Sequence, residues 1–272
     1  MTSLRQALTL EDGGVISLVG AGGKTSLMFR IARELSANGQ SVLTTTTTKM
    51  MMPERSQSPC VIFGAAADTV LHQARSLLKK NPHMTAAAGK LQDERKIGGL
   101  QPETIDLLWQ SGLFRWIIVE ADGAAGRPLK VPADHEPVIP DCTQWLIGLV
   151  GLKAVGKTLN ESWVFRSGLF EKITGLPQGQ AVTAEAIAIA VVHPKGIMKG
   201  APAPARRLAF FNQADLPDML KAARRIAGIL VGKCRTALHR VVIGQVLYDP
   251  PVLECWEVNP NSSGGFSAQH LR

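Results

Sequence analysis

A short apolar run leads directly into a glycine-rich segment, and an amphipathic pattern follows it. The run covers residues 15–19, the segment Gly-Ala-Gly-Gly-Lys-Thr covers residues 20–25, and the pattern covers residues 24–38. These three patterns in this order are typical of a buried strand, a tight turn and a helix with one apolar face. Gly39 is placed to end that helix. The chain is therefore expected to begin its fold as strand, loop and helix.

The same alternation continues along the chain. Because the expected strands are continuously apolar and alternate with helices, we expect a three-layer α/β fold with a mainly parallel sheet and helices on both faces. Residues 1–258 are expected to form one domain, and the polar, Gly/Ser-rich residues 259–272 a flexible tail. Further strands are expected at residues 41–48, 60–63, 84–88, 116–119, 145–150, 208–211, 241–247 and 252–256, and helices after a cap at Asp68, from Pro102 to Trp109, and within residues 216–238.

Composition limits the classes of function. The chain of 272 residues is 45% hydrophobic and 19% charged, as in ordinary globular proteins. No apolar run approaches the roughly 20 residues that span a bilayer, and residues 1–12 contain no signal-like apolar segment. We therefore expect a cytoplasmic protein that does not enter the membrane. The four cysteines have no paired spacing, which favours free thiols over a zinc site.

The net charge of +8 favours anionic partners. Nucleic acid is not the expected one, because the chain has a single Tyr, no dense Lys/Arg block and no aromatic residues interleaved with basic ones. A small molecule that carries phosphates fits this charge at least as well.

The glycine-rich loop has the chemistry of a phosphate site. Its glycines allow backbone N–H groups to converge on phosphate oxygens, and the helix N-terminus adds its dipole. Lys24 is expected to meet the β- and γ-phosphates and the Thr25 hydroxyl to ligate Mg²⁺. The residues expected to bind the nucleoside triphosphate here are Gly20, Ala21, Gly22, Gly23, Lys24, Thr25 and Ser26.

Gly-Lys-Thr occurs twice in the chain, and only one copy has the right context. Residues 151–158 satisfy the pattern G-x-x-x-x-G-K-[ST] literally, whereas in residues 20–25 the first glycine is two positions too close. The motif implies phosphate binding only between a strand and a helix N-terminus. Leu-Asn-Glu-Ser after Thr158 breaks the apolar helical pattern at its start. We therefore assign the phosphates to residues 20–25 and expect residues 151–158 to form an ordinary loop at the same sheet edge.

Two acids follow the strand expected at residues 116–119. Glu120 and Asp122 have strand spacing, so they share a face if the strand persists that far. Carboxylates at the C-terminal end of a strand next to a phosphate loop can hold Mg²⁺ or its water shell. Both residues are predicted to ligate the metal and, with Lys24, to act in catalysis. The alternative for Asp122 is that it only caps the glycine-rich turn.

Asn212-Gln-Ala-Asp215 ends another apolar strand and is similar to the Asn-Lys-x-Asp element of GTP-binding proteins. A carboxylate there accepts two N–H bonds that guanine offers and adenine does not. Asn212 and Asp215 are therefore predicted to contact the base. Gln213 replaces the lysine, which leaves the choice between GTP and ATP open, and a polar turn remains the alternative.

Several other polar residues are weaker candidates. Threonines 44–48 are explained by β-propensity, yet their strand end should lie beside the phosphates, where they and Lys49 could touch metal or substrate. Single histidines are assigned no role. The candidates for binding an acidic second substrate, most of them expected on the solvated surface, are Arg127, Lys130, Lys195, Lys199, Arg206 and Arg207.

Several ordered segments between residues 15 and 256 resemble the YqeC family of selenium-dependent hydroxylase accessory proteins. The resemblance implies a P-loop NTPase fold and a link to the maturation of selenium- or molybdenum-containing hydroxylases. It also implies that Thr158 occupies a position that is commonly proline, so that the second Gly-Lys-Thr is an accident of this chain. The segments are residues 18–25, 42–47, 119–130, 150–157, His-Pro-Lys-Gly at 193–196, and 212–215.

The sequence thus predicts a Mg²⁺-dependent nucleoside triphosphatase, with GTP favoured, whose partners include a molybdenum hydroxylase or its cofactor-maturation machinery. One alternative is an ATP-dependent ligase- or kinase-like enzyme for a small acidic substrate, because Gly-x-x-Gly-Lys-Thr is similar to the short ATP loop of Mur-type ligases. Another is a basic scaffold or nucleic-acid-binding protein with a vestigial loop, which charge alone favours.

Overall fold

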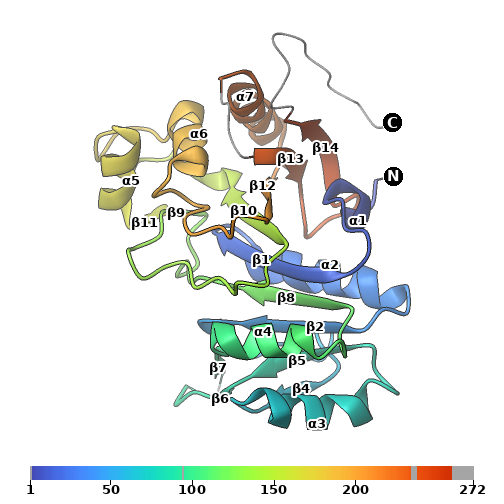
Figure 1. Ribbon diagram of the computed structural model, residues 1–272. Coiled ribbons are helices and arrows are strands. Elements are labelled where there is room, and N and C mark those ends of the chain that lie inside the picture. The colour runs from blue at the N-terminus through green and yellow to red at the C-terminus, as the bar shows by residue number, and fades with distance from the viewer. Residues whose placement is uncertain (1, 94, 234–237, 259–272) are drawn as a thin grey trace.

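The computed structural model describes residues 2–93, 95–233 and 238–258, which form a nine-stranded sheet covered by helices (Figure 1). All neighbouring strands run parallel except the two that come last in the sequence, β13 and β14, which pair antiparallel. In sheet order the strands are β14 (Val252–Glu257), β13 (Leu238–Gly244), β12 (Arg206–Asn212), β10 (Trp145–Gly151), β1 (Gly14–Gly20), β8 (Trp116–Glu120), β2 (Val42–Thr46), β5 (His83–Ala87) and β4 (Val61–Phe63). The predicted α/β class with a mainly parallel sheet is confirmed.

Strand β1 shows why these runs are apolar throughout. Val15 and Val19 belong to the hydrophobic cluster on one face of the sheet, and Ile16 and Leu18 belong to the cluster on the other face. Side chains alternate between the faces of a strand, so a strand with helices on both sides needs apolar residues at every position.

Helices cover both faces. The first cluster contains buried residues of α3 (Ala67–Leu77), α4 (Pro102–Gln110), α5 (Ser167–Thr174), α6 (Ala184–Val192) and α7 (Pro217–Lys233). The second contains those of α1 (Leu4–Ala7) and α2 (Lys24–Ala37). In Figure 1, α3 and α4 lie near β2, β5 and β4, while α5, α6 and α7 lie toward the opposite half of the sheet.

Two small sheets lie outside the main one. Strands β3 (Lys49–Met51), β7 (Lys96–Gly98) and β6 (Gly89–Lys90) form an antiparallel sheet, and β9 (Leu129–Lys130) pairs with β11 (Val164–Phe165). The predicted end of the strand at residues 41–48 is therefore wrong. Strand β2 stops at Thr46, and Lys49 begins a strand of another sheet. The turn between them is closed when the Thr48 N–H donates to the Thr46 hydroxyl, at 3.0 Å.

Helix boundaries differ from the expectations at two places. Ala66 is the N-cap of α3, so Asp68 lies in the first turn rather than at the cap, where its charge still favours the positive helix end. Leu238 begins β13 instead of continuing the helix that starts at Pro217. Its side chain is buried in the core, which favours the sheet.

Helices α1, α5 and α6 were not predicted. In α6 the residues Ala184, Ala186, Ile187, Ala188, Ala190 and Val191 are all buried, so its sequence has no polar face and no 3.6-residue period. No helix of the described residues is long and apolar enough to cross a membrane. The tail predicted at residues 259–272 lies outside the described residues.

Candidate functional site

The glycine-rich loop joins β1 to α2, as the sequence predicts. Gly20, Gly22 and Gly23 have φ angles of 90°, 88° and 122°, a region in which side chains are disfavoured. A Cβ on Gly22 would lie 2.3 Å from the Gly151 nitrogen and 2.8 Å from the Pro128 carbonyl oxygen. The loop is thus pressed against two neighbouring segments, and glycine is required both for the conformation and for the contact.

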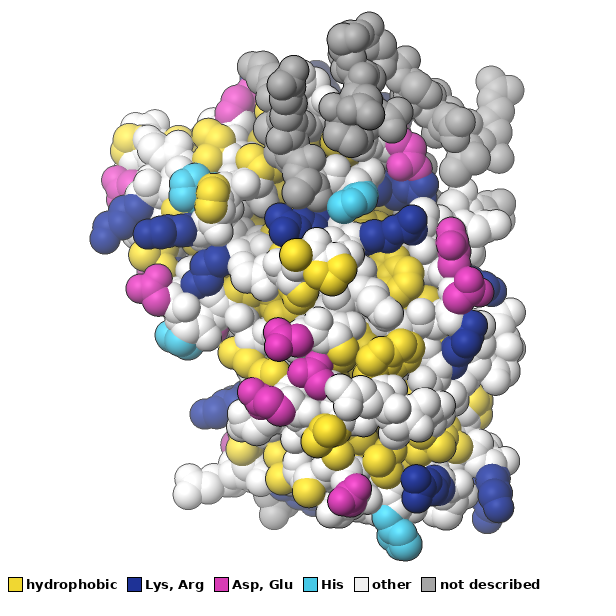
Figure 2. All heavy atoms as spheres, in the orientation of Figure 1, with side chains coloured by type: hydrophobic (Ala, Val, Ile, Leu, Met, Phe, Trp, Pro, Cys, Tyr) yellow, Lys and Arg dark blue, Asp and Glu magenta, His cyan; other side chains and the backbone are white. Residues whose placement is uncertain are grey.

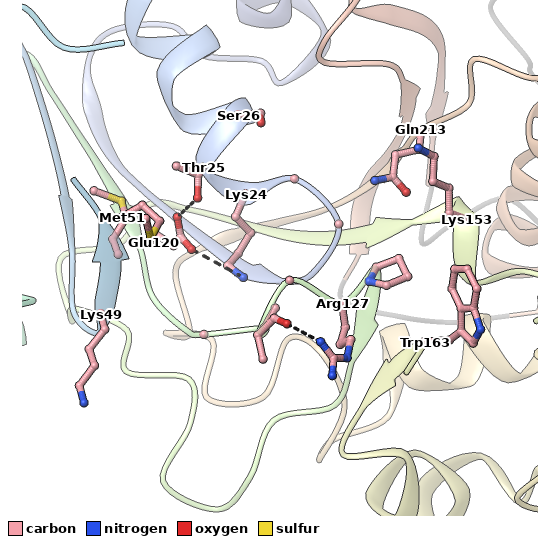
Figure 3. A pocket seen from close by; sticks show the side chains of 18 of the residues that line it. Lys24, Thr25, Ser26, Lys49, Met51, Glu120, Arg127, Lys153, Trp163 and Gln213 are labelled. Carbon is pink, nitrogen blue, oxygen red and sulfur yellow. Dashed lines mark hydrogen bonds and ion pairs between the residues drawn. The ribbon is translucent and has the colours of Figure 1, made fainter. Parts of the chain in front are cut away.

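A cavity of about 760 Å³ opens beside this loop. Most of the charged side chains that line it are Lys or Arg, and Glu120 lies at one side (Figure 3). The residues that line it include positions 22–26 of the loop, positions 123–128 after β8, Lys49, Met50, Met51 and Lys96 of the small sheet, and Lys153, Trp163 and Gln213.

Lys24 is held by the chain itself. Its Nζ donates to the Gly20 carbonyl oxygen at 2.6 Å and lies 3.2 Å from Asp122 Oδ1 and 3.9 Å from Glu120 Oε1. The residue is only 4% exposed. The structure therefore brings together Lys24, Glu120 and Asp122, the three residues predicted for catalysis. The ammonium must change partners, at least in part, to meet a phosphate.

Thr25 and Glu120 form the second contact at the start of α2. The Thr25 hydroxyl donates to Glu120 Oε2 at 2.7 Å (Figure 3). Burial raises the pKa of Glu120, although Lys24 and the Thr25 hydroxyl oppose that effect. A hydroxyl and a carboxylate oxygen in contact are the hard donor set that Mg²⁺ prefers. The described residues contain no group of three or more His, Cys, Asp or Glu that could hold a metal without further ligands.

Asp122 is fully buried and has polar partners on several sides. Its Oδ2 accepts from the Gly20 N–H at 3.1 Å and lies 2.9 Å from the Lys130 ammonium, while Lys24 approaches its Oδ1. Asp122 thus ties the end of β1 to the segment after β8. Oδ1 makes no hydrogen bond among the described residues and is approached only by the Lys24 ammonium. Glu120 lines the cavity and Asp122 does not, so Glu120 is the carboxylate that a ligand in the cavity can reach.

The charges continue away from the cavity through Lys130. Its Nζ donates to the Gly123 carbonyl oxygen at 2.6 Å and to Glu136 Oε2 at 2.7 Å, and Glu136 also pairs with Arg166. Burial alone would raise the pKa of Glu136, but hydrogen bonds from Arg166 and Lys130 outweigh it and lower the pKa to about 2. Lys130 was considered for binding an acidic substrate, but it is fully buried in this network.

Asn212 and Asp215 are placed differently from each other. The Asn212 Nδ2 donates to the Gly22 carbonyl oxygen at 2.7 Å, and its Oδ1 accepts from the Val246 N–H at 3.0 Å. Asn212 therefore fixes the glycine-rich loop to the ends of β12 and β13. Asp215 is exposed and does not line the cavity, whereas Gln213 does.

Threonines 44–48 hydrogen-bond within the protein. Thr44 contacts His83 and Thr85, Thr45 donates to the Ala86 carbonyl oxygen, and Thr46 donates to the Glu120 carbonyl oxygen. Thr47 donates to Val138, and Thr48 contacts Thr46. None of the five lines the cavity, although Lys49 does. These contacts support the packing interpretation of this strand end.

The other basic candidates separate into two groups. Arg127 lines the cavity, where Nε donates to the Glu161 carbonyl oxygen at 2.7 Å and Nη1 to the Ala125 carbonyl oxygen at 2.8 Å. Lys199 instead donates to the carbonyl oxygens of Ala133 and Asp134, at 2.6 and 3.0 Å. Lys195, Lys199, Arg206 and Arg207 do not line this cavity.

The second Gly-Lys-Thr does not precede a helix. After β10 the chain makes a short 3₁₀ turn, Leu152–Ala154, and Thr158 forms an isolated bridge with Ala181. The segment nevertheless reaches the site, because Gly151 contacts Gly22 and Lys153 lines the cavity. Sequence reasoning missed Lys153, since rejecting the motif as a phosphate loop removed its lysines from consideration. Trp163, Met50, Met51 and Lys96 also line the cavity, and none of them carried a sequence signal.

Comparison with known proteins places the chain in a family. Residues 16–168 match the profile of the YqeC protein family. YqeC of Escherichia coli strain K12 is 39% identical over 199 residues, which are 73% of this chain and 75% of that protein. Among solved structures, FtsY from Mycoplasma mycoides aligns with a TM-score of 0.31 and 10% identity, over 89% of this chain and 68% of that one. The matched profile and the identity to the E. coli protein show that this chain belongs to the YqeC family.

Proposed function

We propose that the protein binds a nucleoside triphosphate with Mg²⁺ and hydrolyses it. The observation that supports this most directly is the convergence of the glycine loop, Lys24, Thr25 and Glu120 at one edge of a cationic cavity. Backbone N–H groups at a helix N-terminus and a lysine suit phosphate oxygens. Thr25 and Glu120 would hold the metal, which would supply positive charge to offset that of the terminal phosphates.

Asp122 acts in this proposal as a positioning residue. It orients Lys24, which lines the cavity, and it joins the loop to Lys130. Phosphate oxygens would compete for the ammonium, which would then neutralise charge that develops during phosphoryl transfer. Glu120, which borders the cavity, would also orient the attacking water.

Arg127 is a further candidate for the same reaction, because it lines the cavity from the segment that follows β8. Two backbone carbonyl oxygens fix its guanidinium, and no carboxylate among the described residues pairs with it. A fixed guanidinium without a paired acid is suited to bind an anion. We assign Arg127 to the terminal phosphate.

The choice of nucleotide is part of the proposal. GTP was favoured through Asn212 and Asp215, but Asn212 is engaged with the loop and Asp215 lies outside the cavity lining. GTP therefore remains a proposal, with ATP as the competitor. Calorimetric titration of wild type and Lys24→Ala with each Mg²⁺-nucleotide tests both points. Equal affinity of the two proteins would contradict the assignment of this loop.

We further propose that turnover serves the maturation of a selenium- or molybdenum-dependent hydroxylase in the cytoplasm, as the resemblance to the family implies. Loss of the gene should then lower hydroxylase activity without lowering the amount of hydroxylase protein. On the face drawn in Figure 2, Lys and Arg side chains are scattered among acidic and apolar ones, which gives no support to a nucleic-acid surface there.

A second candidate function is transfer of phosphate to a small acidic substrate, as in a kinase or ligase. Lys49 and Lys96 line the cavity and come from the small sheet rather than from the phosphate loop, so they could hold a second anion. An acidic acceptor that raises the rate of phosphate release or becomes phosphorylated would favour this function over hydrolysis alone.

A further inference from the structure

The cavity extends beyond the phosphate loop on the side away from Thr25 and Glu120. Lys153, Trp163 and Gln213 line this end, which we call the distal end. In Figure 3 these three residues lie on one side of Lys24, while Thr25, Glu120 and Lys49 lie on the other. The three come from separate segments, after β10, before β11 and after β12. The topology therefore brings an aromatic ring, an amide and an ammonium to one end of the cavity.

Gln213 is held in a conformation that needs an explanation. Its φ is 69°, in the left-handed region that non-glycine residues seldom adopt. The residues around it enforce that conformation, because Asn212 is bound to both Gly22 and Val246, and Ala214 N–H donates to the Gly244 carbonyl oxygen at 3.1 Å. At Gln213 the backbone leaves the extended conformation of β12, and the side chain lines the cavity.

The amide of Gln213 also has an unmet hydrogen-bonding capacity. Its Oε1 is buried and has no hydrogen-bond partner among the described residues. A Cβ on Gly151 would lie 2.7 Å from this oxygen, so the amide is packed against the backbone at the end of β10. A buried polar atom without a partner destabilises the folded protein and calls for an explanation, of which a bound ligand is one.

Trp163 supplies an aromatic surface at the same end. Its indole is partly exposed and lines the cavity, and Lys157 Nζ lies over the ring, 5.0 Å from the centroid. An aromatic ring at the wall of an open cavity can stack with the face of a planar base.

We propose that the distal end is the subsite for a purine base, with Trp163 stacking on the ring and the Gln213 amide bonding to its edge. The proposal rests on the proposed nucleotide function and specifies its base site. It orients the triphosphate from Gln213 toward Thr25 and Glu120. Because Oε1 is packed against Gly151, Nε2 is the amide atom that can reach a base, and adenine and guanine both offer it a ring-nitrogen acceptor. Asp215 has no part in this recognition.

The test compares nucleotides with a ligand that has phosphates and no base. Mg²⁺·ATP, Mg²⁺·GTP and Mg²⁺·tripolyphosphate are titrated into wild type, Trp163→Ala, Trp163→Phe and Asp215→Ala, with binding heat as the readout. Removal of the stack should weaken both nucleotides about ten-fold in Trp163→Ala. Tripolyphosphate should bind this variant as it binds wild type, which also shows that the variant is folded. Trp163→Phe should keep most of the nucleotide affinity, and Asp215→Ala all of it.

The other possible results of these titrations each contradict one part of the proposal. If Trp163→Ala binds nucleotides as wild type does, or weakens tripolyphosphate equally, the base does not stack there. If Asp215→Ala weakens GTP alone, the base lies at Asp215 and the subsite is misplaced. If wild type binds tripolyphosphate as tightly as nucleotides, the base subsite is wrong while the phosphate site stands. If wild type binds none of the three ligands, the proposed function itself fails.

Discussion

The ammonium of Lys24 lies 3.2 Å from Asp122 Oδ1, and both side chains are almost completely buried. The lysine that should bind phosphate is therefore also a structural cation of the folded protein. Removing one partner of a buried ion pair leaves an uncompensated charge. Variants at this pair will affect stability and ligand binding together, and experiments must separate the two effects.

Lys24→Ala should lower the free energy of unfolding by about 3 kcal/mol even without nucleotide, because Asp122 and Glu120 lose a shared cation. Nucleotide should raise the Tm of wild type but not that of Lys24→Ala. The informative quantity is the shift in Tm upon addition of Mg²⁺-nucleotide, measured for each protein against its own ligand-free value. A similar shift in both proteins would show that Lys24 does not bind the ligand.

The two Gly-Lys-Thr sequences offer a matched pair of substitutions. Thr25→Val removes a hydroxyl that contacts Glu120, whereas Thr158→Val removes an exposed hydroxyl outside the cavity. Thr25→Val should raise the Mg²⁺ concentration needed for half-maximal hydrolysis about ten-fold, because a metal ligand is lost. Thr158→Val should leave it unchanged. The opposite pattern would mean that the literal motif, not residues 20–25, binds the phosphates.

Gly22→Ala and Gly39→Ala separate contact from conformation. Both glycines have positive φ, 88° and 74°, but an added Cβ meets nothing within 4 Å at Gly39 and meets Gly151 and Pro128 at Gly22. Gly39→Ala should lower stability by about 1 kcal/mol and leave nucleotide affinity intact. Gly22→Ala should be less stable and lose nucleotide binding. Denaturant unfolding and calorimetry measure the two effects, and equal losses in both variants would argue against the tight approach of Gly22 to Gly151.

Arg127→Ala should lower kcat about 100-fold with a smaller change in KM, because a fixed guanidinium acts mainly on charge that develops in the transition state. Arg225→Ala is the control, since Arg225 forms an exposed pair with Glu185 away from the cavity. Steady-state phosphate release measures both variants. A rise in KM alone for Arg127→Ala would restrict this residue to ground-state binding.

Acid stability should depend on His83. Burial lowers the pKa of His83 from 6.5 to about 4, so the unfolded chain takes up a proton before the folded one does. Stability is unaffected by this group above pH 6.5 and falls as the pH drops from about 6.5 to 4, by on the order of 3 kcal/mol.

His83→Gln should lack this loss, which urea unfolding at several pH values would show. Glu136 titrates in a separate range, because its pKa is lowered from 4.5 to about 2 and the stability it contributes is lost only below pH 4.5. Glu136→Gln should therefore leave the pH dependence between 6.5 and 4.5 in place. Wild-type stability that stays constant from pH 6.5 to 4.5 would contradict the assignment to His83.

The sequence pattern predicted best those strands that are buried on both faces along their whole length. Strands β1, β8 and β10 are apolar at nearly every position because helices cover both faces, and the turn between β1 and α2 is marked by glycines that the backbone requires. The strand, loop and helix around residues 20–25 are the context for which these residues were chosen over residues 151–158, and the structure has all three. Local sequence pattern therefore identified the class of fold and the turn between β1 and α2, and phosphate binding by that turn stays a prediction.

Only the tertiary structure decided how polar residues are used. Lys130 and Lys153 are both basic residues close to a strand end, yet one is buried between Asp122 and Glu136 and the other lines the cavity. Asn212 is bound to Gly22 although 190 residues separate them in the chain. Charged and amide side chains act through partners that are distant in sequence. Which residues become those partners depends on the order of the strands in the sheet. The sequence by itself determined the loop, and the tertiary structure determined what surrounds it.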